Sequence, residues 1–160
     1  MMYGLLPIPF RWVMKASLRK VPFMGKACQM AGFIFVDDQK KGSIQETMES
    51  ARQVLSEGTS IFIFPEGSRT LTGRMDRFKK GGFVLAHELD VPIIPVSLDG
   101  SYQALRAGTR WVHPTRLTLT IHPPIHIDKT GEYPRNMLQA LDQVRSSIAS
   151  VLPEEQETLS

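Results

Sequence analysis

Apolar residues recur at helical spacing in three stretches of the chain. The clearest stretch covers residues 43–58, where apolar side chains return every three or four positions and Gly58 stands where a helix commonly ends. A second helix is predicted to begin near Lys79–Gly82 and to reach Leu89, and a third covers residues 137–151. The first and last of these helices have one apolar side, which is typical of helices that pack against a core.

Short apolar runs between these helices predict strands. Phe33–Val36 and Ile61–Phe64 are short continuous apolar runs, which are typical of buried strands, and Ile93–Leu98 is predicted to form another. Residues 117–122 alternate between apolar and polar side chains, as expected of a strand with one exposed face. Strands that alternate with helices predict an α/β fold, with a sheet flanked by helices.

Residues 11–20 admit two interpretations. They are predicted to form a short helix with Trp12 and Val13 on one side and basic residues on the other. Aromatic side chains flanked by basic ones fit a patch at a membrane surface. A partly buried helix with a solvated basic face fits the same pattern equally well.

Composition is typical of one globular domain. The 160 residues are 42% hydrophobic and 22% charged, which predicts a single domain over residues 1–152 and a loose polar tail over residues 153–160. The single cysteine, Cys28, excludes an internal disulfide and favours a reducing compartment. No cysteine and histidine spacing suits zinc, so neither a metal nor a bound cofactor is predicted.

The chain carries a formal net charge of +3, and its first 40 positions hold six basic residues against only Asp37 and Asp38. This charge fits a mildly basic domain, or attraction to phosphate or to an anionic membrane surface. Nucleic-acid binding is not favoured, because no recognition module has its fingerprint here. No apolar run reaches the roughly 18 residues that a membrane-spanning helix needs. The first ten residues lack the basic leading region of a cleaved signal peptide.

The segment after the predicted strand Ile61–Phe64 combines turn residues with positive charge. It lies beyond the carboxyl end of a strand, where open α/β sheets bind ligands. Gly67 permits a tight turn, and Arg69 offers a planar fork of donors for phosphate oxygens. Glu66 can hold that guanidinium or accept a bond from a substrate hydroxyl. Two lysines follow at the start of the next helix, where backbone N–H groups attract anions. The predicted phosphate-binding residues are Glu66, Gly67, Ser68, Arg69, Lys79 and Lys80.

A simpler alternative is a surface turn, in which Glu66 and Arg69 form a solvated ion pair and the lysines are ordinary exposed charges. Exposed charges usually contribute little to stability, so this alternative is as good for any one residue. For the whole set, placed directly after an apolar strand, a binding site is the better interpretation.

Several blocks of the sequence resemble the lysophosphatidic acid acyltransferase family. FPEGSR (Phe64–Arg69) resembles the family's FPEGTR block, FKKG (Phe78–Gly81) resembles the segment that follows it, and VPIIPV (Val91–Val96) resembles a later apolar block. Upstream, Pro22–Gly25 and Gly32–Asp37 resemble the family's PFxG and GxIFID segments. These blocks occur in the family's order.

The resemblance covers residues 5–100 and implies an acyltransferase of phospholipid synthesis. Such an enzyme transfers a fatty acyl group from acyl-CoA or acyl-carrier protein to 1-acyl-glycerol-3-phosphate, giving phosphatidic acid. The resemblance implies that Glu66, Arg69 and Lys79 or Lys80 bind the phosphate of the lysophospholipid acceptor. It further implies an α/β domain associated with the cytoplasmic face of a membrane.

Two features depart from the family's pattern. The family uses a catalytic histidine, followed five positions later by an aspartate, just before the segment that resembles Leu5–Phe10. None of the histidines in this chain has an aspartate at that spacing; they are His87, His113, His122 and His126. The chain is therefore expected to be N-terminally incomplete or, alternatively, to be a homologue that only binds anionic lipid or phosphate headgroups. In addition, Asp38 stands where the family often has an arginine, with Lys40 and Lys41 close behind.

Overall fold

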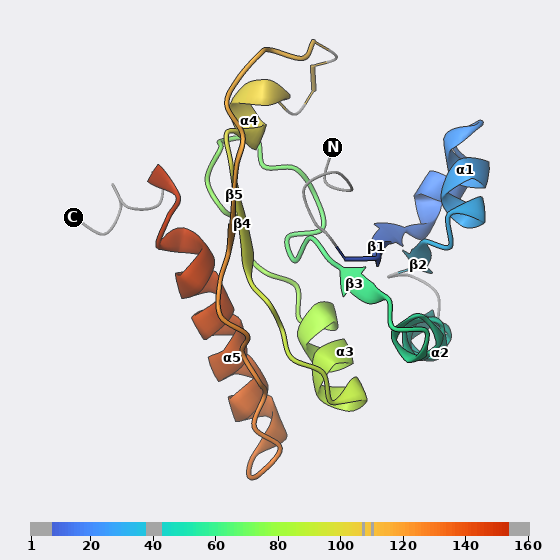
Figure 1. Cartoon of the computed structure of the whole chain (residues 1–160), viewed down its shortest axis with the longest axis vertical. Coiled ribbons are helices and arrows are strands. Elements are labelled where there is room, and N and C mark those ends of the chain that lie inside the picture. Colours follow the sequence, from blue (N-terminus) through green and yellow to red (C-terminus); the bar gives the residue numbers. More distant parts are fainter. Residues whose placement is uncertain (1–7, 38–42, 107, 110, 154–160) are drawn as a thin grey trace. The chain divides into compact units, whose positions relative to one another are not determined.

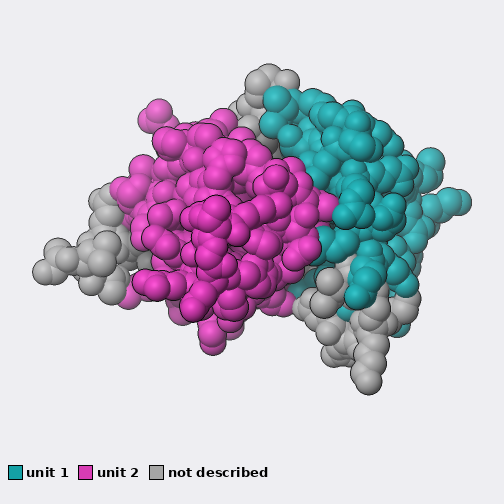
Figure 2. Space-filling model, turned by 90° about the horizontal axis from the view of Figure 1, so that it is seen from below, with its two compact units in different colours: residues 1–64 teal, residues 65–160 magenta. Residues whose placement is uncertain are grey.

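A computed structural model of the chain divides into two compact units, residues 1–64 and residues 65–160 (Figures 1 and 2). The residues that the structure describes are 8–37, 43–106, 108, 109 and 111–153. Each unit has its own sheet and helices. The single domain predicted over residues 1–152 stays a prediction, and most of the predicted polar tail lies outside the described residues.

The first unit contains a three-stranded parallel sheet. Strand β1 (Phe10–Lys15) lies between β2 (Ile34–Val36) and β3 (Ser60–Phe62) and pairs with both. The 3-10 helix η2 (Ala16–Lys20) and the short helix α1 (Met24–Met30) connect β1 to β2. The predicted strand at Phe33–Val36 is thereby confirmed.

Helix α2 (Ser43–Ser56) follows β2 and leads back to β3 (Figure 1). Parallel strands require a crossover of this kind, and the helix supplies it. Ala51 is completely buried on the apolar side of α2, and Gly58 adopts φ +72° just beyond the last turn. The helix predicted over residues 43–58 is confirmed.

The helix predicted over residues 11–20 is wrong in its first half. Residues 10–15 form the central strand β1, so their backbone groups pair with strands on both sides. Phe10 is almost fully buried, and the Trp12 ring lies 4.7 Å from the ring of Phe62. Pairing with two distant strands outweighs local helical spacing here. Only Ala16–Lys20 is helical, so the predicted basic interfacial helix does not form.

The strand predicted at Ile61–Phe64 is present but shifted and less buried. Strand β3 ends at Phe62 and lies at an edge of the three-stranded sheet, where its residues are only half-buried. Phe64 follows the strand and is 53% exposed, although its ring stacks on Trp12 at 5.2 Å.

The described residues of the second unit form two strands and three helices. Strand β4 (Val96–Asp99) pairs antiparallel with β5 (Thr118–Ile121). Helix α3 (Gly81–Leu89) precedes β4, the short helix α4 (Ser101–Ala104) follows it, and α5 (Tyr133–Ala149) runs beside both strands (Figure 1). The predicted helices at residues 79–89 and 137–151 are confirmed as α3 and α5, each with its bounds shifted by a few residues.

A hydrophobic core joins α3 to α5. Phe83 and Ala86 of α3 belong to one buried cluster with Met137, Ala140 and Val144 of α5, and Phe78 and Ile127 complete it. Phe78 and Phe83 lie on either side of Lys79 and Lys80. The core therefore anchors the chain immediately before and after these two predicted binding residues.

The strand predicted at Ile93–Leu98 begins later than expected. Ile93 forms one isolated bridge with Ile125, and the continuous ladder starts only at Val96. Pro95 has no N–H to donate, which explains the interruption. Strand β5 confirms the alternating segment at 117–122, but Ile121 is 57% exposed, so the expected division into a buried and an exposed face is incomplete.

Within the described residues, no helix combines the length and the apolar character needed to cross a bilayer.

Gly25 gives a test of packing in the first unit. A Cβ atom at this position would lie 2.2 Å from the backbone oxygen of Arg19, so Gly25→Ala must push α1 away from η2. We expect the substitution to lower the free energy of unfolding by about 1–3 kcal/mol, as overpacking does. Urea denaturation measures the effect. The matched control is Gly81→Ala, because no atom lies within 4 Å of its Cβ position; equal losses from both substitutions would contradict the packing assignment.

Candidate phosphate site

Residues 65–80, called here the phosphate loop, leave β3 and return to the start of α3. Two hydrogen bonds close the loop. The backbone N–H of Lys79 donates to the oxygen of Pro65 at 2.8 Å, and the backbone N–H of Asp76 donates to the Glu66 carboxylate at 2.8 Å. The outgoing and returning limbs therefore lie side by side, as the predicted site requires.

Gly67 and Lys79 lie close together across the phosphate loop. Gly67 adopts φ +72°, a conformation that side chains rarely tolerate, and a Cβ atom there would lie 3.0 Å from Cε and 3.2 Å from Nζ of Lys79. The lysine side chain therefore lies directly over the glycine. The structure thus supplies the physical reason for a glycine in this block.

Lys80 marks the start of α3. Its backbone oxygen accepts hydrogen bonds from Phe83 and Val84, both at 3.0 Å, and its side chain is exposed. The first N–H groups of a helix lack partners within the helix and present a partial positive charge. The two lysines thus stand at an end of α3 that attracts anions.

Ser68 and Arg69 are exposed on the outgoing limb. Across the described part of the chain, the Arg69 guanidinium forms no hydrogen bond or ion pair. Of the two roles expected of Glu66, the hold on Arg69 is not seen in this structure, where the carboxylate accepts the backbone N–H of Asp76. Arg69 keeps its donors available for another anion.

Hydroxyl groups fix the outer part of the phosphate loop. Thr70 Oγ1 accepts the N–H of Thr72 at 3.1 Å, and Thr72 Oγ1 accepts the N–H of Arg74 at 3.3 Å. The hydroxyl of Tyr102, in α4, donates to the oxygen of Leu71 at 2.9 Å. The threonine turns are local, so they could be predicted from the sequence. The contact of Tyr102 joins residues 31 positions apart and could not be predicted in that way.

His122 is the histidine that contacts a potential nucleophile. Its Nε2 lies 2.8 Å from the Ser97 hydroxyl, which also donates to the oxygen of Ile148 at 3.0 Å. Ser97 is 1% exposed. A hydroxyl has a single proton, and here it is given to Ile148, so Nε2 of His122 is the donor to Ser97. The arrangement ties β4, β5 and α5 together and does not activate Ser97.

The other histidines have no aspartate partner either. His87 packs its ring 4.3 Å from the ring of Tyr133, and its Nδ1 is buried without a hydrogen-bond partner. Among the residues that the structure describes, no histidine side chain is hydrogen-bonded to an aspartate.

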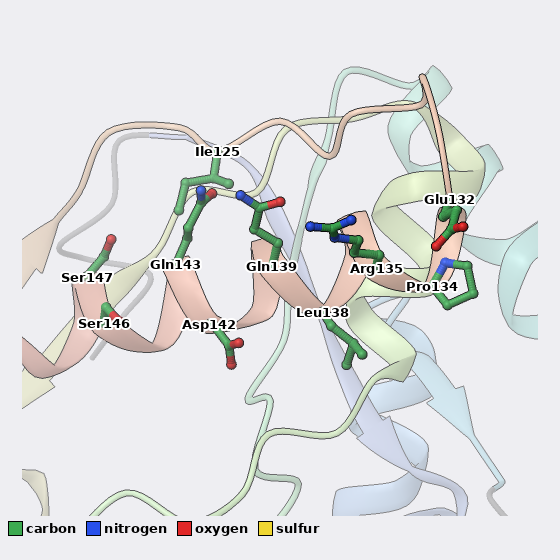
Figure 3. Close-up of a pocket in the computed structure, with 10 residues that line it drawn as sticks. All are labelled: Ile125, Glu132, Pro134, Arg135, Leu138, Gln139, Asp142, Gln143, Ser146 and Ser147. Carbon is green, nitrogen blue, oxygen red and sulfur yellow. The ribbon is translucent and has the colours of Figure 1, made fainter.

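An open groove of about 1060 Å³ runs along α5. Figure 3 shows Arg135, Gln139 and Gln143 on the same side of the helix as Ile125. None of the predicted phosphate-binding residues lines this groove. The groove is open to solvent, and its lining includes the carboxylates of Glu132 and Asp142.

Comparison with known proteins identifies the family. A family model described as Acyltransferase matches residues 1–99, which is more than half of the chain. The chain belongs to the acyltransferase family. The phosphate loop lies wholly within the matched residues, whereas β5 and α5 lie beyond them.

Curated relatives agree with this assignment. A 1-acyl-sn-glycerol-3-phosphate acyltransferase of Chlamydomonas reinhardtii is 28% identical over 92% of this chain and 43% of its own length. The alpha form of 1-acyl-sn-glycerol-3-phosphate acyltransferase of Mus musculus is 35% identical over 81% of this chain and 46% of its own length. The chain spans about half the length of the curated relatives it matches.

A solved structure shares the fold. The crystal structure of the 1-acyl-sn-glycerophosphate acyltransferase PlsC from Thermotoga maritima aligns with a TM-score of 0.67 at 24% identity. The alignment covers 89% of this chain and 56% of that one. The α/β fold class predicted from the sequence is confirmed. The departure at Asp38, with Lys40 and Lys41, lies outside the described residues.

Gly67→Ala tests the contact with Lys79. The substitution should lower the free energy of unfolding by about 1–2 kcal/mol, because a Cβ is disfavoured at positive φ, and it should weaken binding of glycerol 3-phosphate by displacing the lysine. Gly58→Ala is the control, since Gly58 has the same φ of +72° with no atom within 4 Å of its Cβ position. Calorimetric titration of both variants with glycerol 3-phosphate measures the two affinities. Equal affinities would show that Lys79 takes no part in binding.

Ser97→Ala separates a structural serine from a nucleophile. The variant should lose about 1–3 kcal/mol of stability, since two partly buried polar groups lose their partner. Any transferase activity per folded molecule should be retained, because the serine is buried and its proton is committed to a backbone carbonyl. Thermal unfolding and an activity assay well below the transition give both readouts. A stable variant without activity would contradict the structural assignment.

Proposed function

We propose that the protein transfers a fatty acyl group from acyl-CoA or acyl-carrier protein to 1-acyl-glycerol-3-phosphate, giving phosphatidic acid. The observation that carries the proposal is the closed phosphate loop, in which Lys79 lies over Gly67 and Arg69 is exposed without a partner among the described residues. The names of the curated relatives support the same substrate class.

The phosphate loop would bind the phosphate monoester of the acceptor. Lys79 supplies a compact charge beside the glycine turn, while Arg69 supplies a planar fork that fits two phosphate oxygens. A bound phosphate would leave the glycerol hydroxyl free to attack the thioester carbonyl. The hydroxyl proton must pass to a base while the thiol leaves, and a histidine paired with an aspartate suits that task. Such a pair is absent from these 160 residues, so the chain's own contribution is acceptor binding.

We expect the protein to act at a membrane surface, because both the acceptor and the product are lipids. Exposed apolar side chains in the first unit support this expectation. Phe23 is 93% exposed and Met30 is 81% exposed, and exposed Lys20 and Lys26 lie close by in sequence. Exposed apolar side chains among basic residues suit an anionic lipid surface. We place the protein at the cytoplasmic face as part of the same proposal.

Arg69→Ala is the decisive variant for acceptor binding. In the natural protein, including any residues that flank these 160, the variant should raise the KM for 1-acyl-glycerol-3-phosphate by roughly 10- to 100-fold, the range expected for losing a charge-assisted hydrogen bond. The value of kcat should change much less, because the contact is made equally in the ground and transition states.

A steady-state assay with vesicle-borne acceptor and acyl-CoA or acyl-carrier protein measures both constants. Arg135→Ala is the control, because Arg135 is equally exposed but lies along the α5 groove. An unchanged KM in Arg69→Ala would remove Arg69 from the site. Absence of any acyl transfer by the natural protein would refute the proposed function and leave phosphate or headgroup binding as the alternative.

A further inference from the structure

Arg145, on α5, reaches the returning limb of the phosphate loop. One terminal nitrogen of its guanidinium donates to the backbone oxygen of Asp76 at 2.6 Å, and the other donates to the oxygen of Met75 at 3.3 Å. The same guanidinium lies 5.4 Å from the centre of the Phe78 ring. One side chain therefore contacts three of four successive loop residues from a helix about 70 positions away in sequence.

These contacts lead directly to the predicted binding residues. Asp76, whose oxygen accepts from Arg145, gives its N–H to the Glu66 carboxylate at 2.8 Å. Three residues later, the N–H of Lys79 bonds to Pro65 at 2.8 Å. Arg145 thus fixes residues 75 and 76 of the returning limb. This limb hydrogen-bonds to Glu66 and leads to Lys79, whose side chain lies over Gly67.

We propose that Arg145 is a positioning residue for the phosphate loop: it sets the geometry of acceptor binding without touching the acceptor. The inference rests on the proposed function for the identity of the bound phosphate. Its geometric part, the order of the loop, stands independently. Arg145 lies outside residues 1–99 that the family model matches, so the assignment comes from the structure alone.

The chemistry of the contact favours arginine over other residues. Two successive carbonyl oxygens point to one side, and a planar guanidinium can donate to both at once. A lysine ammonium is a single point charge on a flexible stem and cannot reproduce this fork. Without the arginine, the two carbonyl oxygens would accept hydrogen bonds from water instead, and the returning limb would sample more conformations.

Three variants of the natural protein test the proposal. Arg145→Met keeps an apolar stem over Phe78 and removes every donor, whereas Arg145→Lys keeps the charge and removes the fork. Arg135→Met is the matched control, since Arg135 is an exposed arginine of the same helix that lines the groove of Figure 3. Amide hydrogen exchange of residues 65–80 and of residues 137–144 is measured beside the steady-state constants for the acceptor.

We expect exchange across residues 65–80 to accelerate in Arg145→Met, with residues 137–144 unchanged. The acceptor KM should rise about fivefold. The effect is modest because the lost hydrogen bonds are made to backbone oxygens of the loop and not to the acceptor itself. The value of kcat should stay within about twofold, as for a contact that affects binding alone. Arg145→Lys should give an intermediate KM, and Arg135→Met should match the unmodified protein in every readout.

Two results would overturn the proposal. One is unchanged exchange and KM in Arg145→Met. The other is acceleration in residues 137–144 equal to that in the loop, which would make Arg145 a general stabiliser of α5. If Arg145→Met fails to fold, Arg145→Lys answers the same question. If the natural protein transfers no acyl group, the proposed function fails, and exchange in the loop still decides the role of Arg145.

Discussion

The return of the chain from Asp76 to Pro65 is the constraint on which the rest of the site depends. Two backbone N–H groups, those of Asp76 and Lys79, reach back across the loop to Glu66 and Pro65. The carboxylate of Glu66 acts here as a structural acceptor rather than as a partner for Arg69. Without these bonds, the two limbs of the phosphate loop would have no reason to lie together at the proposed anion site. The buried rings of Phe78 and Phe83 hold the helix start in place.

Helices were more predictable than strands in this chain, for a physical reason. Periodic burial of apolar side chains is a local property, so the spacing in residues 43–58 was enough to predict α2. Strands take their stability from partners elsewhere, and β1 shows the consequence, since its residues have helical spacing but pair with β2 and β3. The late start of β4 follows from Pro95, whose missing N–H is a local property of the sequence.

The contacts of the predicted binding residues also divide into those that local sequence signals predict and those that depend on distant segments. Gly67 and Lys79 could be brought together from the sequence, because a turn glycine and a helix start are both local signals. The partner of Glu66 could not be predicted, because any of several donors near the loop was chemically suitable. Arg145 and the Ser97–His122 contact were beyond reach as well, since each joins segments whose proximity exists only after the core has formed.

The isolation of Arg69 has a consequence for how an anion is received. Among the described residues its guanidinium pairs with no carboxylate, so in the proposed site an anion that binds Arg69 has no such partner to displace from it. What it must overcome is the rotamer freedom of a long exposed side chain, which is an entropic penalty. A contact of this exposed, electrostatic kind is expected to weaken as the salt concentration rises.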